Sequence, residues 1–158
     1  CKDGICNLGK WNGKEIVYEV QSANFEYVQY SVGRTVPAYC SALGKAILAY
    51  LPEAALATYI QRTPMEGFTE KTCTTEERLR AELQEVRERG YAIMDGELYL
   101  PLKGLAVPLL SGDGQVKYAI SATRTQYGPI DSLIEDMLVP LQETAHDIVE
   151  YMKFYHFD

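Results

Sequence analysis

Small residues stand at the start of a segment that should form a helix. In the stretch "VPAYCSALGKAILAYLP", residues 36–52, apolar side chains recur from Leu43 onwards with the i, i+3, i+4, i+7 spacing of one helix face. The first backbone N–H groups of a helix have no partner inside it, and the helix dipole favours negative charge there. Ser41 is placed to cap this helix, and Ala42 and Gly44 leave the next amides poorly covered. The pattern predicts a site for a small carboxylate, with close packing of the helix on a sheet at Gly44 as the alternative.

Two hydroxyl groups in a later segment are candidates for hydrogen bonding to a ligand. Ser121 and Thr123 occupy alternate positions in the otherwise apolar run "VKYAISATRT". Alternate residues of a strand face the same side, so both hydroxyls could bind one ligand. They could also point to water or satisfy neighbouring backbone groups. Asp95, within "IMDGEL", is either a turn residue or an acceptor for a ligand hydroxyl.

The motifs of the common enzyme classes are absent. The sequence contains no G-x-S-x-G, no phosphate-binding G-x-x-x-x-G-K-[ST] and no G-x-G-x-x-G. Cys40 and the distant His146 could in principle form a nucleophile and its base, whereas the commoner role of such a cysteine is a small buried thiol. The four cysteines lack metal-ligand spacing, and only His146 and His156 could add imidazole ligands. We therefore expect no catalysis, no metal and no cofactor.

The composition indicates a globular protein that does not bind nucleic acid by itself. The chain has 158 residues, a hydrophobic share of 47% and a formal charge of −7 at pH 7. This length suits one domain with a single core. The negative charge would repel a phosphate backbone. No run is long and apolar enough for a membrane span, and the first residues lack a signal pattern, so we expect a cytoplasmic location without membrane contact.

Hydrophobic periodicity divides the chain into strands, then helices, then strands, and then one long helix. Asn12-Gly13 suits the turn of a first hairpin, and the "SGDGQ" turn suits a second. Pro140 should bend or restart the closing helix. The order predicts an α+β fold, an antiparallel sheet with helices packed on it. The expected strands are residues 4–22 as a hairpin, 25–32, 91–98, 102–110 and 116–125, and the expected helices are 43–50, 52–60, 74–89 and a segment around 134–152.

Four stretches resemble one family in its order and spacing. They are "VGRTVPAYCSALGKAILAYLP", "AELQEVRERGYAIMDGE", "LAVPLLSGDGQVKYAISAT" and "LVPLQETAHDIVEYM". Between Gly4 and Tyr151 the chain resembles the C-terminal effector-binding domain of IclR-family bacterial transcriptional regulators. The resemblance implies a curved antiparallel sheet of about five to six strands, similar to the GAF and profilin type, with a small-molecule pocket on its inner side. Residues 1–158 would then be one effector-binding domain.

The resemblance also implies where an effector would bind. The family's helix-start motif falls on residues 41–44, and its hydroxyl-bearing strand falls on Ser121 and Thr123. Met94 stands where the family usually has an acidic residue, with Asp95 one place later, and Gly104 stands where it often has a cysteine. The lost polar contact and the gained space imply a ligand larger or more apolar than a two- or three-carbon acid. The implied effector-binding residues are Ser41, Ala42, Leu43, Gly44, Met94, Asp95, Gly104, Ser121 and Thr123.

The family resemblance implies a sensor rather than an enzyme. The expected ligand is a small organic acid, a sugar acid or an aromatic acid, whose binding would be transmitted through a homodimer or homotetramer. DNA binding in the family belongs to an N-terminal winged helix-turn-helix, which is absent from this chain. The alternative is an oligomerisation module without a functional ligand site, in which an apolar stripe of Leu79, Leu83 and Val86 would supply surface.

Overall fold

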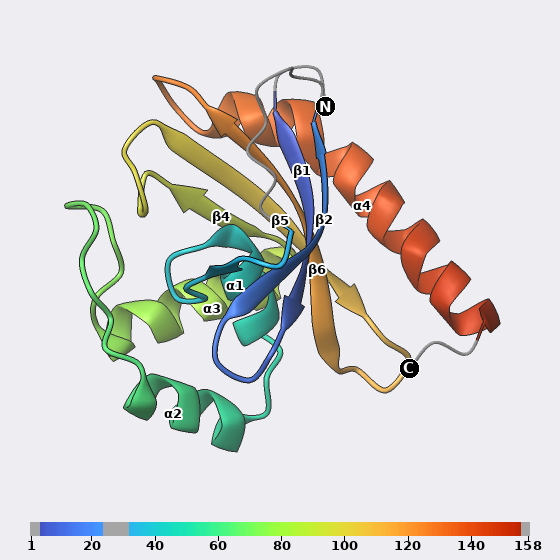
Figure 1. The fold of residues 1–158 in the computed structure, drawn as a ribbon, viewed down its shortest axis with the longest axis horizontal. Coiled ribbons are helices and arrows are strands. Elements are labelled where there is room, and N and C mark those ends of the chain that lie inside the picture. Colours follow the sequence, from blue (N-terminus) through green and yellow to red (C-terminus); the bar gives the residue numbers. More distant parts are fainter. Residues whose placement is uncertain (1–3, 24–31, 156–158) are drawn as a thin grey trace.

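Six antiparallel strands form one curved sheet at the centre of the molecule (Figure 1). The computed structural model describes residues 4–23 and 32–155. The strand order is β3-β2-β1-β6-β5-β4, so the first and last strands, β1 and β6, pair with each other at the centre of the sheet. The strands are β1 (Ile5–Trp11), β2 (Ile16–Ala23), β3 (Thr35–Val36), β4 (Ala92–Asp95), β5 (Leu102–Leu110) and β6 (Val116–Thr125).

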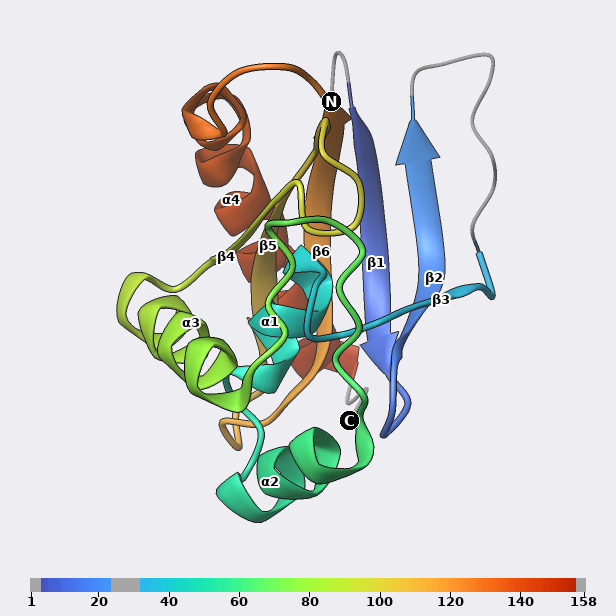
Figure 2. The ribbon, with the colours of Figure 1, turned by 90° about the vertical axis from the view of Figure 1, so that its left-hand side faces the viewer.

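Four helices cover the two faces of this sheet. The long α4 lies along one face, α1 packs on the other, α3 packs against α1, and α2 lies on the same side near the end of the sheet (Figures 1 and 2). Within the described residues, no helix is both long and apolar enough to cross a membrane. The helices are α1 (Ala42–Leu48), α2 (Glu53–Arg62), α3 (Glu76–Arg89) and α4 (Asp131–Tyr155).

Alternation along the central strands creates a separate apolar core on each face. On β5, Leu105 and Val107 pack with α4, whereas Ala106 between them packs with α1. On β6, Ile120 joins the α4 core and Ala119 joins the α1 core. Side chains of successive strand residues point to opposite sides of a sheet. The side that each of these residues faces therefore fixes the side of every other residue in the same strand. We call the side covered by α1 the inner face and the side covered by α4 the outer face.

Both predicted hairpins are confirmed. Gly13 in the first turn has a φ of 95°, and Asn12 Oδ1 accepts hydrogen bonds from the amides of Lys14 and Glu15 at 2.9 and 2.8 Å. In the second turn, Gly114 has a φ of 77°. A positive φ suits glycine because it lacks a Cβ. These local turn signals therefore determine the pairing of β1 with β2 and of β5 with β6.

Three other expectations have different outcomes. Most of the strand predicted at 25–32 lies outside the described residues, and the structure adds the short β3 instead. Pro140 lies inside α4 and does not restart it, since the helix runs without interruption. The idea that the apolar stripe on α3 supplies an oligomer surface is wrong. Its three side chains are fully buried in the protein's own inner core: Leu79, Leu83 and Val86.

Candidate functional site

The start of α1 has the geometry that the sequence predicts. Ser41 is its N-cap, with extended φ and ψ of −120° and 148°, and its Oγ accepts a hydrogen bond from the amide of Gly44 at 3.1 Å. Among the described residues, the amides of Ala42 and Leu43 have no hydrogen-bond acceptor. The side chain of Leu43 is directed to the sheet, where it would contact a Cβ placed on Gly9. Leu43 therefore offers a ligand its backbone amide and not its side chain.

Gly44 is required by packing. A Cβ on Gly44 would overlap the Cα, the carbonyl carbon and the oxygen of Ala38. The close contact is thus with the backbone that precedes α1, whereas the sequence suggested contact with the sheet. Because backbone atoms cannot turn aside as a side chain can, this position has room only for hydrogen. Gly44 fixes the seating of α1 and gives no sign of direct contact with a ligand.

Three predicted residues form a row across neighbouring strands beneath the start of α1. Gly104 on β5 is in register with Met94 on β4 and with Thr123 on β6. A Cβ on Gly104 would lie 3.2 Å from the Cβ of Ala42 and 3.4 Å from the Cε of Met94. The Oγ1 of Thr123 donates a hydrogen bond to the carbonyl oxygen of Ile5 at 3.3 Å. Four residues that are far apart in the sequence therefore meet on the inner face: Ala42, Met94, Gly104 and Thr123.

A polar row continues this arrangement, and of its members the sequence indicated Ser121 but neither Asn7 nor Gln21. Ser121, which is 1% exposed, is in register with Asn7 on β1, and Asn7 Nδ2 donates to Ser121 Oγ at 3.5 Å. Gln21 on β2 donates from Nε2 to Asn7 Oδ1 at 2.9 Å. Asn7 is itself buried, and buried amides need such partners. The signal available in the sequence was an asparagine inside a strand, where its propensity is low.

Asp95 is the predicted site residue that the structure does not bring to this group. Along β4, Met94 belongs to the inner core and Ile93 to the outer core, so Asp95 faces the outer side. Its Oδ1 pairs with the buried Lys103 and, at 3.5 Å, with Lys71. Burial raises the pKa of Asp95, but the hydrogen bond and charge of Lys103 outweigh that effect and lower it. Asp95 is therefore an ion-pair partner at the edge of the sheet, where it lines a cavity with Lys45 and Glu97, rather than a neighbour of Met94 on the same side of β4.

The family of the chain follows from a match over nearly its whole length. Residues 2–150 match the family model described as "Bacterial transcriptional regulator IclR C-terminal". The chain belongs to this family. The α+β architecture and the six-stranded curved sheet agree with the resemblance found in the sequence.

Known relatives place this IclR C-terminal domain among bacterial regulators. It is 33% identical to the Pca regulon regulatory protein of Pseudomonas putida over 85% of this chain and 47% of that protein. The chain spans about half the length of the curated relatives it matches. The crystal structure of the Thermotoga maritima IclR aligns with a TM-score of 0.86 at 27% identity, over 96% of this chain and 62% of that one.

A further structure shows the same fold in an isolated domain. The inducer-binding domain of the PobR transcription factor from Acinetobacter, in a double mutant complexed with 3-hydroxybenzoic acid, aligns with a TM-score of 0.82. Its identity is 22%, and the alignment covers 92% of this chain and 87% of that domain. The relatives are transcriptional regulators, which are not enzymes.

Cys40 and His146 do not form a catalytic pair in this IclR-type domain. Cys40 is fully buried just before α1, on the inner side of the sheet. His146 is exposed on α4, which covers the outer face. Burial, with a contribution from the charge of Glu97, raises the pKa of the Cys40 thiol to about 12. In the described part of the chain, no three His, Cys, Asp or Glu side chains gather as metal ligands.

The Cys40 thiol is expected to be inert in the native protein. A thiolate is the reactive form of cysteine, and a buried thiol with a high pKa forms almost none at pH 8. We expect a thiol reagent to modify half-buried Cys6 far faster than Cys40, and Cys40 to react only after unfolding in guanidinium. Mass spectrometry of peptides after timed labelling measures both rates. Fast native labelling of Cys40 would contradict the burial described above.

A separate aromatic groove lies outside the inner-face group. It has a volume of about 780 Å³ and is lined by Trp11, Tyr59 and Phe68 together with Arg62. The rings of Trp11 and Tyr59 meet edge to face with centroids 5.5 Å apart. Aromatic walls and a cation can bind planar anions, so this groove is the alternative location against which binding at the inner face must be tested.

Proposed function

We propose that residues 1–158 form the effector-binding domain of a longer cytoplasmic regulator and that this domain binds a small organic acid on its inner face. The observation that carries the proposal is the meeting of Ala42 with Met94, Gly104 and Thr123, four residues that the family resemblance implies for the effector. Residues so distant in sequence are brought together here by the register of β4, β5 and β6 and by the seating of α1.

The carboxylate would accept hydrogen bonds from the amides of Ala42 and Leu43. The Oγ of Ser41 already accepts a hydrogen bond from the amide of Gly44. The described residues supply no acceptor for the amides of Ala42 and Leu43. Since α1 has only seven residues, direct N–H bonds contribute more than a long-range dipole. Thr123 and Ser121 would bind the rest of the acid, and Asn7, beside Ser121, could adjust its amide to either a donor or an acceptor.

The apolar wall of the site favours an aromatic acid over a sugar acid. The space expected from Gly104 is taken up by the side chains of Met94 and Ala42. Met94 is a flexible apolar side chain, which can move aside for a ring and contact it through sulfur. The PobR domain supports this choice by example, because a domain of the same fold was crystallised with 3-hydroxybenzoic acid. Sugar acids, which carry hydroxyls on most of their carbons, would leave several polar groups unpaired against Met94.

Occupancy would act on DNA through quaternary structure. We propose that the whole protein is a homodimer or homotetramer with two arrangements, and that the acid binds one of them more tightly. Binding would then shift the population towards that arrangement and change how DNA-binding modules outside this chain are placed. The competing function, an oligomerisation module without a ligand site, loses the surface first suggested for it, because the α3 stripe is buried.

Calorimetric titration of the isolated chain with a panel of sugar acids and aromatic acids tests the proposal. We expect at least one aromatic acid to bind with 1:1 stoichiometry per chain and to alter the sedimentation coefficient of the oligomer. A stable oligomer whose sedimentation is insensitive to every acid, without measurable heat, would instead favour the oligomerisation module.

A further inference from the structure

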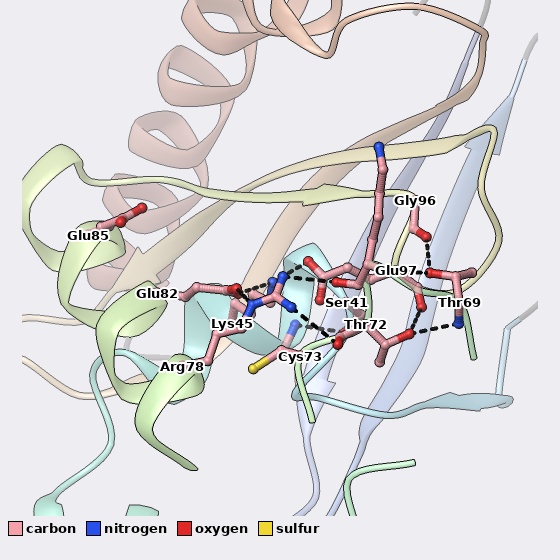
Figure 3. Close-up of polar contacts among 12 residues, drawn as sticks. Ser41, Lys45, Thr69, Thr72, Cys73, Arg78, Glu82, Glu85, Gly96 and Glu97 are labelled. Carbon is pink, nitrogen blue, oxygen red and sulfur yellow. Dashed lines mark hydrogen bonds and ion pairs between the residues drawn. The ribbon is translucent and has the colours of Figure 1, made fainter. Parts of the chain in front are cut away.

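A buried lysine lies one helical turn after the N-cap of α1. Lys45 is 2% exposed, and its amide donates to the carbonyl oxygen of Ser41 at 3.0 Å. Its ammonium group forms ion pairs with Glu97 and with Glu82 of α3 (Figure 3). Lysine is almost never fully buried unless it is paired. The charge of Lys45 is thus balanced inside the protein, next to the proposed effector site.

Glu97 lies in the connection between the two strands that contain Met94 and Gly104. This connection leads from β4, which ends just after Met94, to β5, which contains Gly104. Glu97 is 5% exposed, and its Oε2 has no hydrogen-bond partner among the described residues. Burial raises the pKa of Glu97 despite the opposing charge of Lys45. The ion pair between Lys45 and Glu97 therefore joins the start of α1 to the β4–β5 connection.

A short loop holds the Glu97 end of this pair in place. Thr72 donates from Oγ1 to the carbonyl oxygen of Glu97 at 2.6 Å, and Thr69 donates to the carbonyl oxygen of Gly96 at 2.6 Å (Figure 3). The Thr72 hydroxyl also accepts from the amides of Phe68 and Thr69, at 3.0 and 2.9 Å. With its backbone fixed in this way, Glu97 gives Lys45 an anchor of defined position.

Net stability is a poor explanation for such a pair. The cost of removing two charges from water offsets most of their attraction, and apolar replacements of similar size are often as stable or more stable. Unlike apolar packing, an ion pair with hydrogen bonds holds two groups at a defined distance and in a defined direction. We propose that Lys45 and Glu97 are positioning residues that hold the start of α1 at a set distance from the β4–β5 connection and thereby set the affinity for the acid. The second half of this inference rests on the proposed function.

Two variants separate positioning from stability. Lys45→Met leaves Glu97 without its partner, whereas Lys45→Met combined with Glu97→Met removes both charges and leaves Glu82 with its second partner, Arg78. The matched control is Lys153→Met, which breaks the exposed pair with Glu150 on α4. Thermal unfolding gives the stability of each variant, and amide hydrogen exchange measured by mass spectrometry gives the local order of each segment.

We expect the double variant to melt near the wild-type temperature while exchange in residues 41–48 and 96–104 is about tenfold faster and exchange in α4 is unchanged. The control should change neither segment. Return of exchange to the wild-type rate in the double variant would overturn the proposal, as would an equal rise in α4. If Lys45→Met does not fold, the double variant alone decides.

A ligand arm uses 3-hydroxybenzoate as the probe. If the wild-type chain binds it, the double variant should bind about tenfold more weakly, which corresponds to about 1.4 kcal/mol. Equal affinity would overturn the proposal. If the wild-type chain does not bind the probe or any acid of the panel, the proposed function fails, and the exchange experiment still decides whether Lys45 and Glu97 position α1.

Discussion

Replacement of Gly44 by alanine is expected to destabilise the domain by about 4 kcal/mol or more. The added Cβ would overlap the backbone of Ala38, and neither the loop nor α1 can retreat without opening a fully buried core around Ile47 and Ala46. Overpacking against backbone is more costly than overpacking against a side chain, which can change rotamer. Urea unfolding followed by circular dichroism measures the loss.

Gly112→Ala is the matched control for this change. Gly112 lies in the β5–β6 turn, its φ is not positive, and a Cβ there would meet nothing within 4 Å. The same substitution should leave the free energy of unfolding within about 1 kcal/mol of wild type, or raise it slightly. Equal stability of the two variants would mean that α1 is seated less closely on Ala38 than described here.

The double change Ser121→Ala and Thr123→Ala is expected to weaken binding of an aromatic acid about a hundredfold. Two hydrogen bonds to neutral groups, each contributing about 1.5 kcal/mol, together correspond to about a hundredfold in affinity. Both hydroxyls lie on the inner face beside Gly104 and Ala106. Because Ser121→Ala also removes the acceptor of the buried Asn7 amide, thermal unfolding is measured first to establish that the variant is folded at the temperature of the titration. Calorimetry with the acid of highest affinity measures the difference.

Thr144→Ala provides the control for the loss of a hydroxyl. Thr144 is exposed on α4, where its Oγ1 donates only to the carbonyl oxygen of Pro140 at 2.8 Å. This variant should bind the acid as tightly as wild type. Unchanged affinity in the Ser121 and Thr123 variant would show that neither hydroxyl contacts the acid. The aromatic groove around Trp11 would then be the favoured binding site.

Elements set by local signals could be predicted from the sequence. The two hairpins depend on turn residues with unusual φ, and the helices depend on a regular apolar spacing, so neighbouring residues contain the necessary information. The cap of α3 shows the limit of this approach. The sequence predicts that this helix begins at residue 74, whereas Thr75 is its N-cap and accepts from the amide of Arg78. Two adjacent threonines leave such a boundary undecided by one residue.

The candidate site was only partly predictable because it depends on register. No spacing in the sequence says that Met94, Gly104 and Thr123 are neighbours, and the family resemblance alone supplied that grouping. The side of a strand residue follows from the same register, so the sequence alone does not show that Asp95 and Met94 point to opposite sides of β4. Asn7 was missed because the run "ICNLGKW" shows no alternation that would separate a buried face from an exposed one.

A crystal structure of this chain with a bound aromatic acid tests the central claim most directly. We expect the carboxylate to lie within hydrogen-bond distance of the amides of Ala42 and Leu43. Met94 should have moved away from Gly104, and the ring should lie near Ser121 and Thr123. An acid bound instead in the groove of Trp11, Tyr59 and Phe68, with the inner face closed by Met94 as in the free protein, would contradict it.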